Sequence, residues 1–271
     1  MVITQTPYRI SFFGGGTDYP EWYKENGGQV LSTTVDKYLY MTCRYLPPFF
    51  EHRLRLVYSS IELCDSADEL KHPSAREVLK YLNIVRDVEI HYDGDLPGRS
   101  GMGSSSAFTV GLLHALYAFI EKDVTPEQLA NESIHIEQNL VHEVVGSQDQ
   151  VSAAYGGFNK IQFLQDGEIL VHPISVDKDR LNHLEERMML FFTGIIRTAE
   201  NVAETYVRDI KSRSQQLRKL HAMVDDSVDI LSGFGELDDF GRLLHEGWME
   251  KRSLSTEVSN STVDEIYNIA R

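Results

Sequence analysis

Leu96-Pro97-Gly98-Arg99-Ser100-Gly101-Met102-Gly103-Ser104-Ser105-Ser106-Ala107 is the most informative stretch of this 271-residue chain. Its three glycines and four serines stand between an expected strand at Val88–Tyr92 and an expected long helix at Ser104–Glu121. Glycine lets backbone amides approach a ligand closely, and the free N–H groups at a helix N-terminus favour phosphate. The stretch therefore predicts a phosphate-binding loop, although a flexible loop capped by serine would have the same composition.

Two common glycine-rich motifs do not fit this loop. Gly98 and Gly103 have the spacing of a Walker A motif, but Ser104 stands where that motif has its lysine. The loop also lacks the G-x-S-x-G pattern of a nucleophile elbow. The sequence therefore disfavours a P-loop NTPase.

The rest of the chain is expected to hold mixed strands and helices first and mostly helices later. The expected strands are Val2–Phe13, Gln29–Val35, Tyr38–Tyr45 after a turn at Asp36-Lys37, Leu54–Ser60, Phe158–Leu164, Glu168–Pro173 and Arg187–Phe192. The other expected helices are Ser74–Leu82, 126–141, Ala199–Leu231, Leu237–Leu254 and the residues from Thr262 onward. The change in character places a domain boundary between residues 175 and 190.

Composition narrows the class of protein. With 42% hydrophobic and 25% charged residues, the chain has an ordinary soluble composition. The net charge of −15 argues against nucleic acid as a partner, and the longest nearly apolar stretch, Val110–Ile120, is about half the ~20 residues of a membrane-spanning helix. With no visible signal peptide and only two cysteines, we expect a cytoplasmic protein with no membrane partner.

The charge is unevenly distributed along the chain. Residues 1–60 hold 6 Lys and Arg against 5 Asp and Glu, a net charge of +1, so the remainder carries −16. An anionic ligand would therefore be favoured near the N-terminal segment, with Lys24, Lys37, Arg44 and Arg55 as its cations. The alternative is that the surface charge only aids solubility.

Glu137 is a candidate buried carboxylate. In the expected helix 126–141 it shares one face with Ala130, Ile134 and Val141, which are all apolar. A carboxylate on an apolar face must find a cation or a hydrogen-bond donor, or shift its pKa. A frayed or rotated helix would instead leave Glu137 at the edge.

Two further polar segments could carry chemistry. Asp149, within Gly146-Ser147-Gln148-Asp149-Gln150, could be a general base, a metal ligand or a helix cap. Arg9 lies in the expected first strand, where a lone arginine is usually an edge residue. Gly14-Gly15-Gly16 follows it and indicates a close backbone approach.

Taken in order, these four segments resemble the GHMP kinases, the family of galactokinase, homoserine kinase, mevalonate kinase and phosphomevalonate kinase. Residues 97–107 are similar to the family's Pro-x-Gly-x-Gly-Leu-Gly-Ser-Ser-Ala, with Met102 for the usual Leu and one Ser for an Ala. Residues 7–19 resemble the first galactokinase motif, Pro-x-Arg…Gly…Thr-Asp-Tyr. Glu137 precedes Asp149 by 12 positions, as the family's metal-binding Glu precedes its catalytic Asp.

The resemblance spans essentially the whole chain and implies a fold. That fold is α+β with two domains, whose N-terminal half is similar to ribosomal protein S5 domain 2. The expected domains are 1–182, for ATP and substrate, and 183–271. Because the family's third glycine-rich motif has no counterpart in these 271 residues, we expect the second domain to be incomplete.

The resemblance also implies residue roles. Mg²⁺ would be held by Ser105 and Glu137, Asp149 would orient or deprotonate the acceptor hydroxyl, and Arg9 would stabilise charge near Asp149 and the transferring phosphoryl group. The residues expected to bind ATP are Pro97, Gly98, Ser100, Gly101, Met102, Gly103, Ser104, Ser105 and Ser106. Those expected to bind the substrate are Arg9, Gly14, Gly15, Gly16, Thr17, Asp18 and Asp149, with Asp18 on sugar hydroxyls.

One departure from the galactokinase pattern bears on the substrate. Galactokinases carry Gly-Glu-His-Thr-Asp where this chain has Gly14-Gly15-Gly16-Thr17-Asp18, so Gly15 removes a negative charge and frees volume. The segment is similar to that of D-glycero-D-manno-heptose 7-phosphate kinases, which phosphorylate an anomeric hydroxyl. Alternatives are a kinase for another sugar, such as a galactokinase- or fucokinase-like enzyme, or a non-catalytic binding protein. A metal hydrolase using His114, His135 and His142 is disfavoured because no His-Glu-x-x-His spacing occurs.

Overall fold

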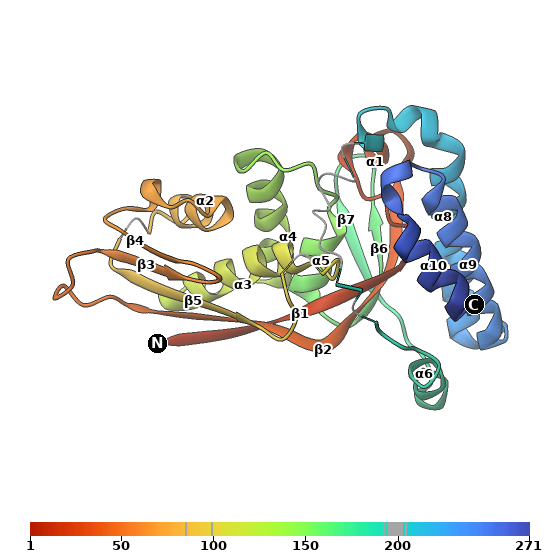
Figure 1. Cartoon of the computed structure of the whole chain (residues 1–271), viewed down its shortest axis with the longest axis horizontal. Helices are drawn as coiled ribbons and strands as arrows, with labels where there is room; N and C mark the ends of the chain where they lie inside the picture. Colours follow the sequence, from red (N-terminus) through yellow and green to blue (C-terminus); the bar gives the residue numbers. More distant parts are fainter. Residues whose placement is uncertain (85, 99, 192, 195–202, 204) are drawn as a thin grey trace. The chain divides into compact units, whose positions relative to one another are not determined.

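The computed structural model describes residues 1–84, 86–98, 100–191, 193–194, 203 and 205–271 (Figure 1). By their contacts these residues form two compact units. Unit 1 contains 1–9, 34–145 and 149–156, and unit 2 contains 10–33, 146–148 and 157–271. The chain thus passes between the units several times, and the expected boundary at 182 remains a prediction from the sequence.

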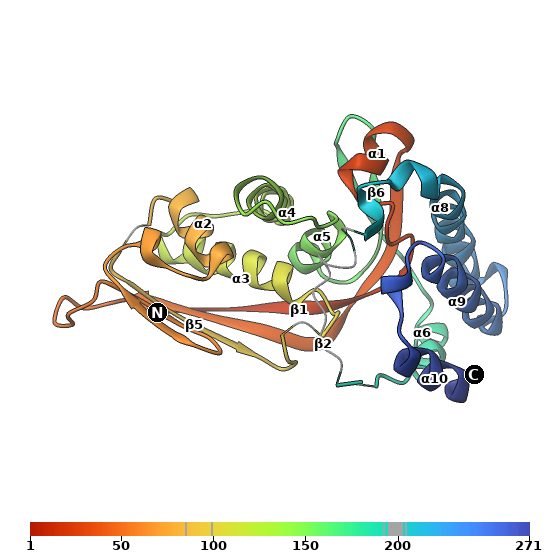
Figure 2. The same ribbon diagram turned by 45° about the horizontal axis from the view of Figure 1, so that its top comes forward.

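Besides residues 2–9 of β1 (Val2–Phe13), unit 1 holds four neighbouring strands. Their order is β4 (Ile61–Cys64), β3 (Leu54–Val57), β5 (Val88–Gly94) and residues 39–45 of β2 (Gly28–Tyr45). β3 runs parallel to β5, and the other two pairs are antiparallel. Figures 1 and 2 show α2 (Pro73–Tyr81), α3 (Ser104–Phe119) and α4 (Pro126–His135) on the same side of these strands.

The core of unit 1 follows from the two-residue period of a strand. Leu39, Met41 and Cys43 are fully buried, and the residues between them are partly exposed. Most of α3 is buried as well, which is why its sequence is apolar on all sides. A strand face and an apolar helix therefore bury each other and hold the loop that precedes α3.

The expected helix over 126–141 changes its form partway. Thr125 caps α4, because its hydroxyl oxygen accepts a hydrogen bond from the backbone amide of Gln128 at 3.1 Å. At Ile136 the α-helix gives way to a π-helical turn over Ile136–Leu140, which includes Glu137. π-Helical turns are rare and often occur at functional sites.

Unit 2 combines the other half of β2 with short strands and helices. Residues 28–33 of β2 pair with β6 (Phe158–Phe163), which pairs with β7 (Ile169–Pro173). The helices are α1 (Pro20–Asn26), α6 (Lys178–Glu185), α8 (Ser214–Asp229), α9 (Leu237–Arg252) and α10 (Ser261–Ala270). In its core the rings of Phe13, at the end of β1 (Val2–Phe13), and Phe240 of α9 meet edge to face at 5.2 Å.

Some expected elements are wrong. β2 continues through Asp36 and Lys37, whose side chains are exposed, so two polar residues here do not break the strand. In the expected strand Arg187–Phe192, residues 187–191 form no strand, and Phe192 lies outside the described residues. Most of the apolar side chains of residues 187–191 are exposed. An apolar pattern makes a strand only beside a free sheet edge. The expected helix over 199–231 begins outside the described residues and is interrupted by a 3-10 turn at Ile210–Arg213.

Expectations for the remaining elements agree with the structure to within a few residues, and the α+β class is confirmed. The helices α1, α5 (Gln148–Tyr155) and α6 and the strand β4 were not expected from the sequence. Within the described residues, none of the helices has the length and apolar character needed to cross a membrane.

Candidate functional site

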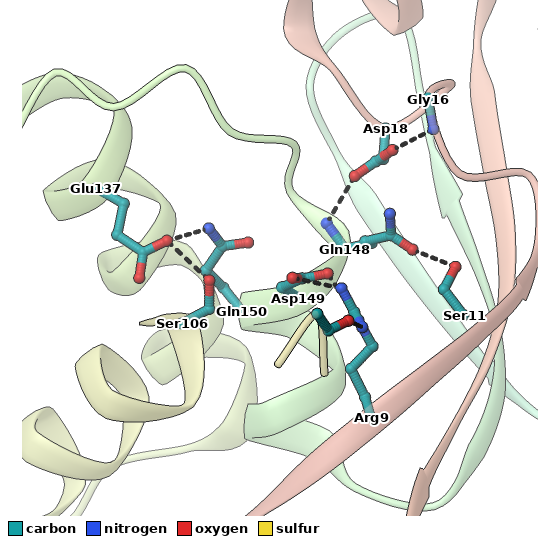
Figure 3. A network of polar contacts seen from close by, with 10 residues as sticks. Arg9, Ser11, Gly16, Asp18, Ser106, Glu137, Gln148, Asp149 and Gln150 are labelled. Carbon is teal, nitrogen blue, oxygen red and sulfur yellow. Dashed lines mark hydrogen bonds and ion pairs between the residues drawn. The ribbon is translucent and has the colours of Figure 1, made fainter. Parts of the chain in front are cut away.

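Arg9 and Asp149 form a bidentate ion pair in unit 1 (Figure 3). The Arg9 Nε donates to Asp149 Oδ1 at 2.8 Å, and Nη2 donates to Oδ2 at 2.6 Å. Asp149 lies in the first turn of α5 (Gln148–Tyr155), where the helix dipole favours a carboxylate. Such a paired geometry fixes the orientation of both groups and leaves each Asp149 oxygen with capacity for a further hydrogen bond.

The same arginine also holds the glycine-rich loop. Its Nη1 donates to the Gly101 carbonyl at 2.9 Å, and its backbone amide donates to the Met102 carbonyl at 3.2 Å. Gly103, with a φ of 74°, precedes α3, and a Cβ there would lie 3.3 Å from Arg9 Cγ and 3.4 Å from Asp149 Oδ2. Arg9, the loop and the start of α5 are therefore one connected cluster.

The loop itself leaves room for a ligand. A Cβ added to Gly98 or Gly101 would meet no atom of the described residues within 4 Å, and the side chain of Met102 is turned into the interior. Ser104 and Ser105 begin α3, and Ser105 is exposed. A helix start behind an open glycine-rich loop is the arrangement that binds phosphate groups through backbone N–H donors.

Glu137 is completely buried, as its apolar helix face predicts. Its Oε2 accepts hydrogen bonds from the Ser106 hydroxyl at 2.9 Å and from the side-chain amide of Gln150 (Figure 3). Its Oε1 is buried without a hydrogen-bond partner among the described residues. Burial raises the pKa of this carboxyl from 4.5 to about 7, against the lowering effect of its hydrogen bonds.

A divalent cation would suit this carboxylate. Mg²⁺ prefers oxygen ligands and usually takes one or two carboxylates together with substrate phosphates and water. The unpartnered Glu137 Oε1 is such a ligand, so the residues fit the metal. The hydroxyl that contacts Glu137 belongs to Ser106, whereas the expected ligand Ser105 stays a prediction. Among the described residues, no three His, Cys, Asp or Glu side chains gather as a metal-binding group.

In unit 2, Thr17 and Asp18 are buried and hold the glycine segment before them. The Thr17 hydroxyl donates toward the carbonyls of Gly14 and Gln29. The carboxylate of Asp18 accepts hydrogen bonds from the backbone amides of Gly16 at 2.9 Å and Gln148 at 3.3 Å (Figure 3). Asp18 thus fixes two backbone segments, and a role on sugar hydroxyls remains a prediction.

Three of the four N-terminal cations expected to attract an anion are paired with carboxylates. Arg44 and Arg55 are on either side of Glu89 in the strands of unit 1, with closest distances of 2.5 and 3.3 Å. Lys37 pairs with its neighbour Asp36 at 3.3 Å. The local charge count of residues 1–60 therefore does not identify the cation of an anion site.

Several polar residues that contact or lie beside the expected site residues had no role predicted from the sequence. Ser106 and Gln150 hold Glu137, while the Ser11 hydroxyl donates to Gln148 Oε1 at 2.6 Å (Figure 3). Gln148 and Gln150 flank Asp149 in the sequence, and this position next to a candidate site residue could have pointed to them. Lys251 of α9 lies beside Gly15 and had no signal at all, because 236 positions separate it from that glycine.

Comparison with known proteins finds relatives of this chain. Residues 70–157 match the family profile described as "GHMP kinases N terminal domain". A D-glycero-alpha-D-manno-heptose 7-phosphate kinase from Campylobacter jejuni is 28% identical over 98% of this chain and 82% of that protein. The bifunctional fucokinase/GDP-fucose pyrophosphorylase of Arabidopsis thaliana is 23% identical over 98% of this chain, but this covers only 27% of that protein.

The fold agrees with solved structures. A crystal structure of a D-glycero-D-manno-heptose 1-phosphate kinase from Bacteroides thetaiotaomicron superposes with a TM-score of 0.78 at 23% identity, over 95% of this chain and 81% of that one. Residues 70–157 thus match the N-terminal domain of the GHMP kinases, and the chain has the mixed α/β fold of that family. The resemblance inferred from the four sequence segments is confirmed.

Proposed function

We propose that this chain is a Mg²⁺- and ATP-dependent sugar kinase that phosphorylates a sugar phosphate. The substrate we infer is D-glycero-D-manno-heptose 7-phosphate, phosphorylated at its anomeric hydroxyl for the synthesis of a nucleotide-activated heptose. We place it in the cytoplasm. The reaction moves the γ-phosphoryl group of ATP to the acceptor oxygen, and the hydroxyl proton is released.

The observation that carries the kinase proposal is the Arg9–Asp149 pair attached to an open glycine-rich loop. Phosphoryl transfer depends mostly on positioning and on neutralising charge. Asp149 would accept a hydrogen bond from the acceptor hydroxyl and orient it. Arg9 would keep Asp149 in place and stabilise negative charge on the transferring group.

The nucleotide would be bound by the loop and the start of α3. Backbone N–H groups of Gly98 and of residues 100–106 would hold the phosphates, and Pro97 and Met102 would shape the loop. Glu137, with Ser105, would hold Mg²⁺, which neutralises phosphate charge when bound. Ser106 and Gln150 would keep the Glu137 carboxylate aimed at the metal.

The choice of a sugar phosphate rests on Gly15 and on the similarity to heptose kinases. Gly14–Asp18 would hold the substrate, and the absence of a carboxylate at Gly15 favours an anionic one. The candidates to compare are a neutral sugar, such as fucose or galactose, and binding without turnover.

The test is a screen of ATP consumption with the chain across neutral sugars and sugar phosphates. Heptose 7-phosphate should give ADP with Mg²⁺ present, and phosphorus NMR should place the new phosphate on the anomeric oxygen. Turnover of a neutral hexose alone would replace the proposed substrate. Nucleotide binding without ADP formation from any acceptor would favour a non-catalytic protein.

A further inference from the structure

Gly15 differs from the two glycines on either side of it. Gly14 and Gly16 have φ angles of 83° and 108°, a region that favours glycine, whereas the φ of Gly15 is not positive. A Cβ at Gly14 would also lie 2.0 Å from the Gln29 carbonyl oxygen, which cannot move away easily. Backbone geometry thus explains Gly14 and Gly16 but does not explain Gly15.

The space in front of Gly15 is surrounded by polar side-chain atoms of unit 2. A Cβ on Gly15 would lie 2.9 Å from Lys251 Nζ, 3.5 Å from Gln148 Nε2 and 3.7 Å from Ser11 Oγ. These atoms come from α9, from the start of α5 and from β1, which are far apart in the sequence. Three polar groups therefore converge on the one place that a side chain at position 15 would fill.

The orientation of the amide is fixed by a hydrogen bond. The Ser11 hydroxyl donates to Gln148 Oε1 at 2.6 Å (Figure 3). The two N–H groups of Gln148 Nε2 are therefore on the side of the amide that faces the space near Gly15. The nearby Asp18 carboxylate accepts backbone amides of Gly16 and Gln148. Glu250, next to Lys251 in the sequence, pairs with Lys219 at 2.6 Å.

We propose that Lys251 and Gln148 form an anion subsite over Gly15 that binds the phosphate group already present on the substrate. A lysine ammonium supplies a positive charge and N–H donors, and a carboxamide supplies further N–H donors, which suits a phosphate monoester. Glycine at position 15 keeps the subsite open. Lys251 is then a specificity residue that separates sugar phosphates from neutral sugars.

This inference rests on the proposed function for the identity of the ligand, but binding tests it without turnover. The affinity of the chain, free of nucleotide, is measured by titration calorimetry for heptose 7-phosphate and for the same heptose without phosphate. Hydrogen bonds to charged groups contribute about 1.5–3 kcal/mol, which corresponds to about 10- to 150-fold in affinity. The phosphate should therefore tighten binding of the heptose by about that factor.

Three variants address the subsite and one serves as a control. Lys251→Met should weaken binding of heptose 7-phosphate about 10- to 150-fold and leave the affinity for heptose unchanged, and Lys251→Arg should restore part of the loss. Gly15→Ala should act in the same direction, because its methyl group would displace the ammonium. The control is Lys211→Met, since Lys211 is an exposed lysine of unit 2 that pairs with Glu25.

The possible outcomes separate the subsite from the reaction. The subsite is wrong if Lys251→Met binds heptose 7-phosphate as tightly as the parent chain does. It is also wrong if the variant loses affinity for heptose and for heptose 7-phosphate by the same factor. Either result holds even where the kinase assay succeeds. If the phosphate dependence disappears with Lys251 but no acceptor yields ADP, the subsite stands and the kinase proposal fails. Should circular dichroism find Lys251→Met unfolded, Gly15→Ala decides, and a parent chain that does not prefer the phosphorylated sugar overturns the subsite.

Discussion

Glu137→Gln should make the stability of the metal-free chain less sensitive to pH. The Glu137 carboxyl is fully buried, and desolvation raises its pKa from 4.5 to about 7. The folded chain therefore keeps this proton at pH values where the unfolded chain has lost it. The stabilising contribution of the protonated carboxyl is complete below pH 4.5 and is lost as the pH rises to about 7.

The size of the effect follows from this interval. At about 1.4 kcal/mol for each pH unit, ionisation of Glu137 costs the folded state about 3 kcal/mol above pH 7, of which about 2.5 kcal/mol develops between pH 5 and pH 8. Glutamine cannot ionise, so the variant escapes this cost. Any fixed cost of burying the new amide is the same at both pH values and cancels.

The assay is urea unfolding of both chains with a chelator present, at pH 5 and at pH 8. The free energy of unfolding of Glu137→Gln minus that of the parent chain should be larger at pH 8 by about 2.5 kcal/mol. Glu127→Gln, an exposed substitution in the first turn of α4, should stay within about 0.5 kcal/mol of the parent at both values. An unchanged difference between the two pH values would refute the reasoning about Glu137.

Three further predictions concern the site. Asp149→Asn should lower kcat by about 10³-fold or more while the Kd for ATP changes little, as measured by coupled assay and calorimetry; near-parental turnover would exclude the assigned role. Gly146→Ala should lower Tm by several degrees in a thermal scan, because its Cβ would lie 1.9 Å from Asp18 Oδ2; an unchanged Tm would mean that Asp18 can move at no cost. Ser105→Ala should raise the Mg²⁺ concentration for half-maximal activity, and identical Mg²⁺ titrations of this variant and the parent would remove Ser105 from the metal site. Ser106→Ala should raise that concentration and also lower the free energy of unfolding by about 1 kcal/mol.

Much of the fold could be predicted because local patterns reported it. The alternation of β5, the Thr-Pro start of α4 and the long apolar α3 each carry their signal within a few residues. The failures concern long-range context. Asp36 and Lys37 have the composition of a turn, yet residues 28–33 of β2 pair with β6 and residues 39–45 pair with β5, and pairing on both sides keeps them extended.

The candidate site divides in the same way. Arg9, Asp149, Glu137 and the glycine-rich loop could be identified because the family motifs keep them at recognisable spacings. Which serine contacts Glu137 could not be read from Ser104-Ser105-Ser106, since all three have the same chemistry. The rotation of α3 decides that the hydroxyl is that of Ser106.

By itself, the sequence determined the family, the class of reaction to consider and the residues most important to test, because motifs record chemistry that must stay at fixed positions along the chain. Only the tertiary structure decided which cation faces Gly15. The N-terminal Arg44 and Arg55 are both paired with Glu89, while Lys251 reaches Gly15 from a helix near the other end of the chain. The physical reason is that electrostatic interactions depend on distance in space, which packing sets and sequence separation does not.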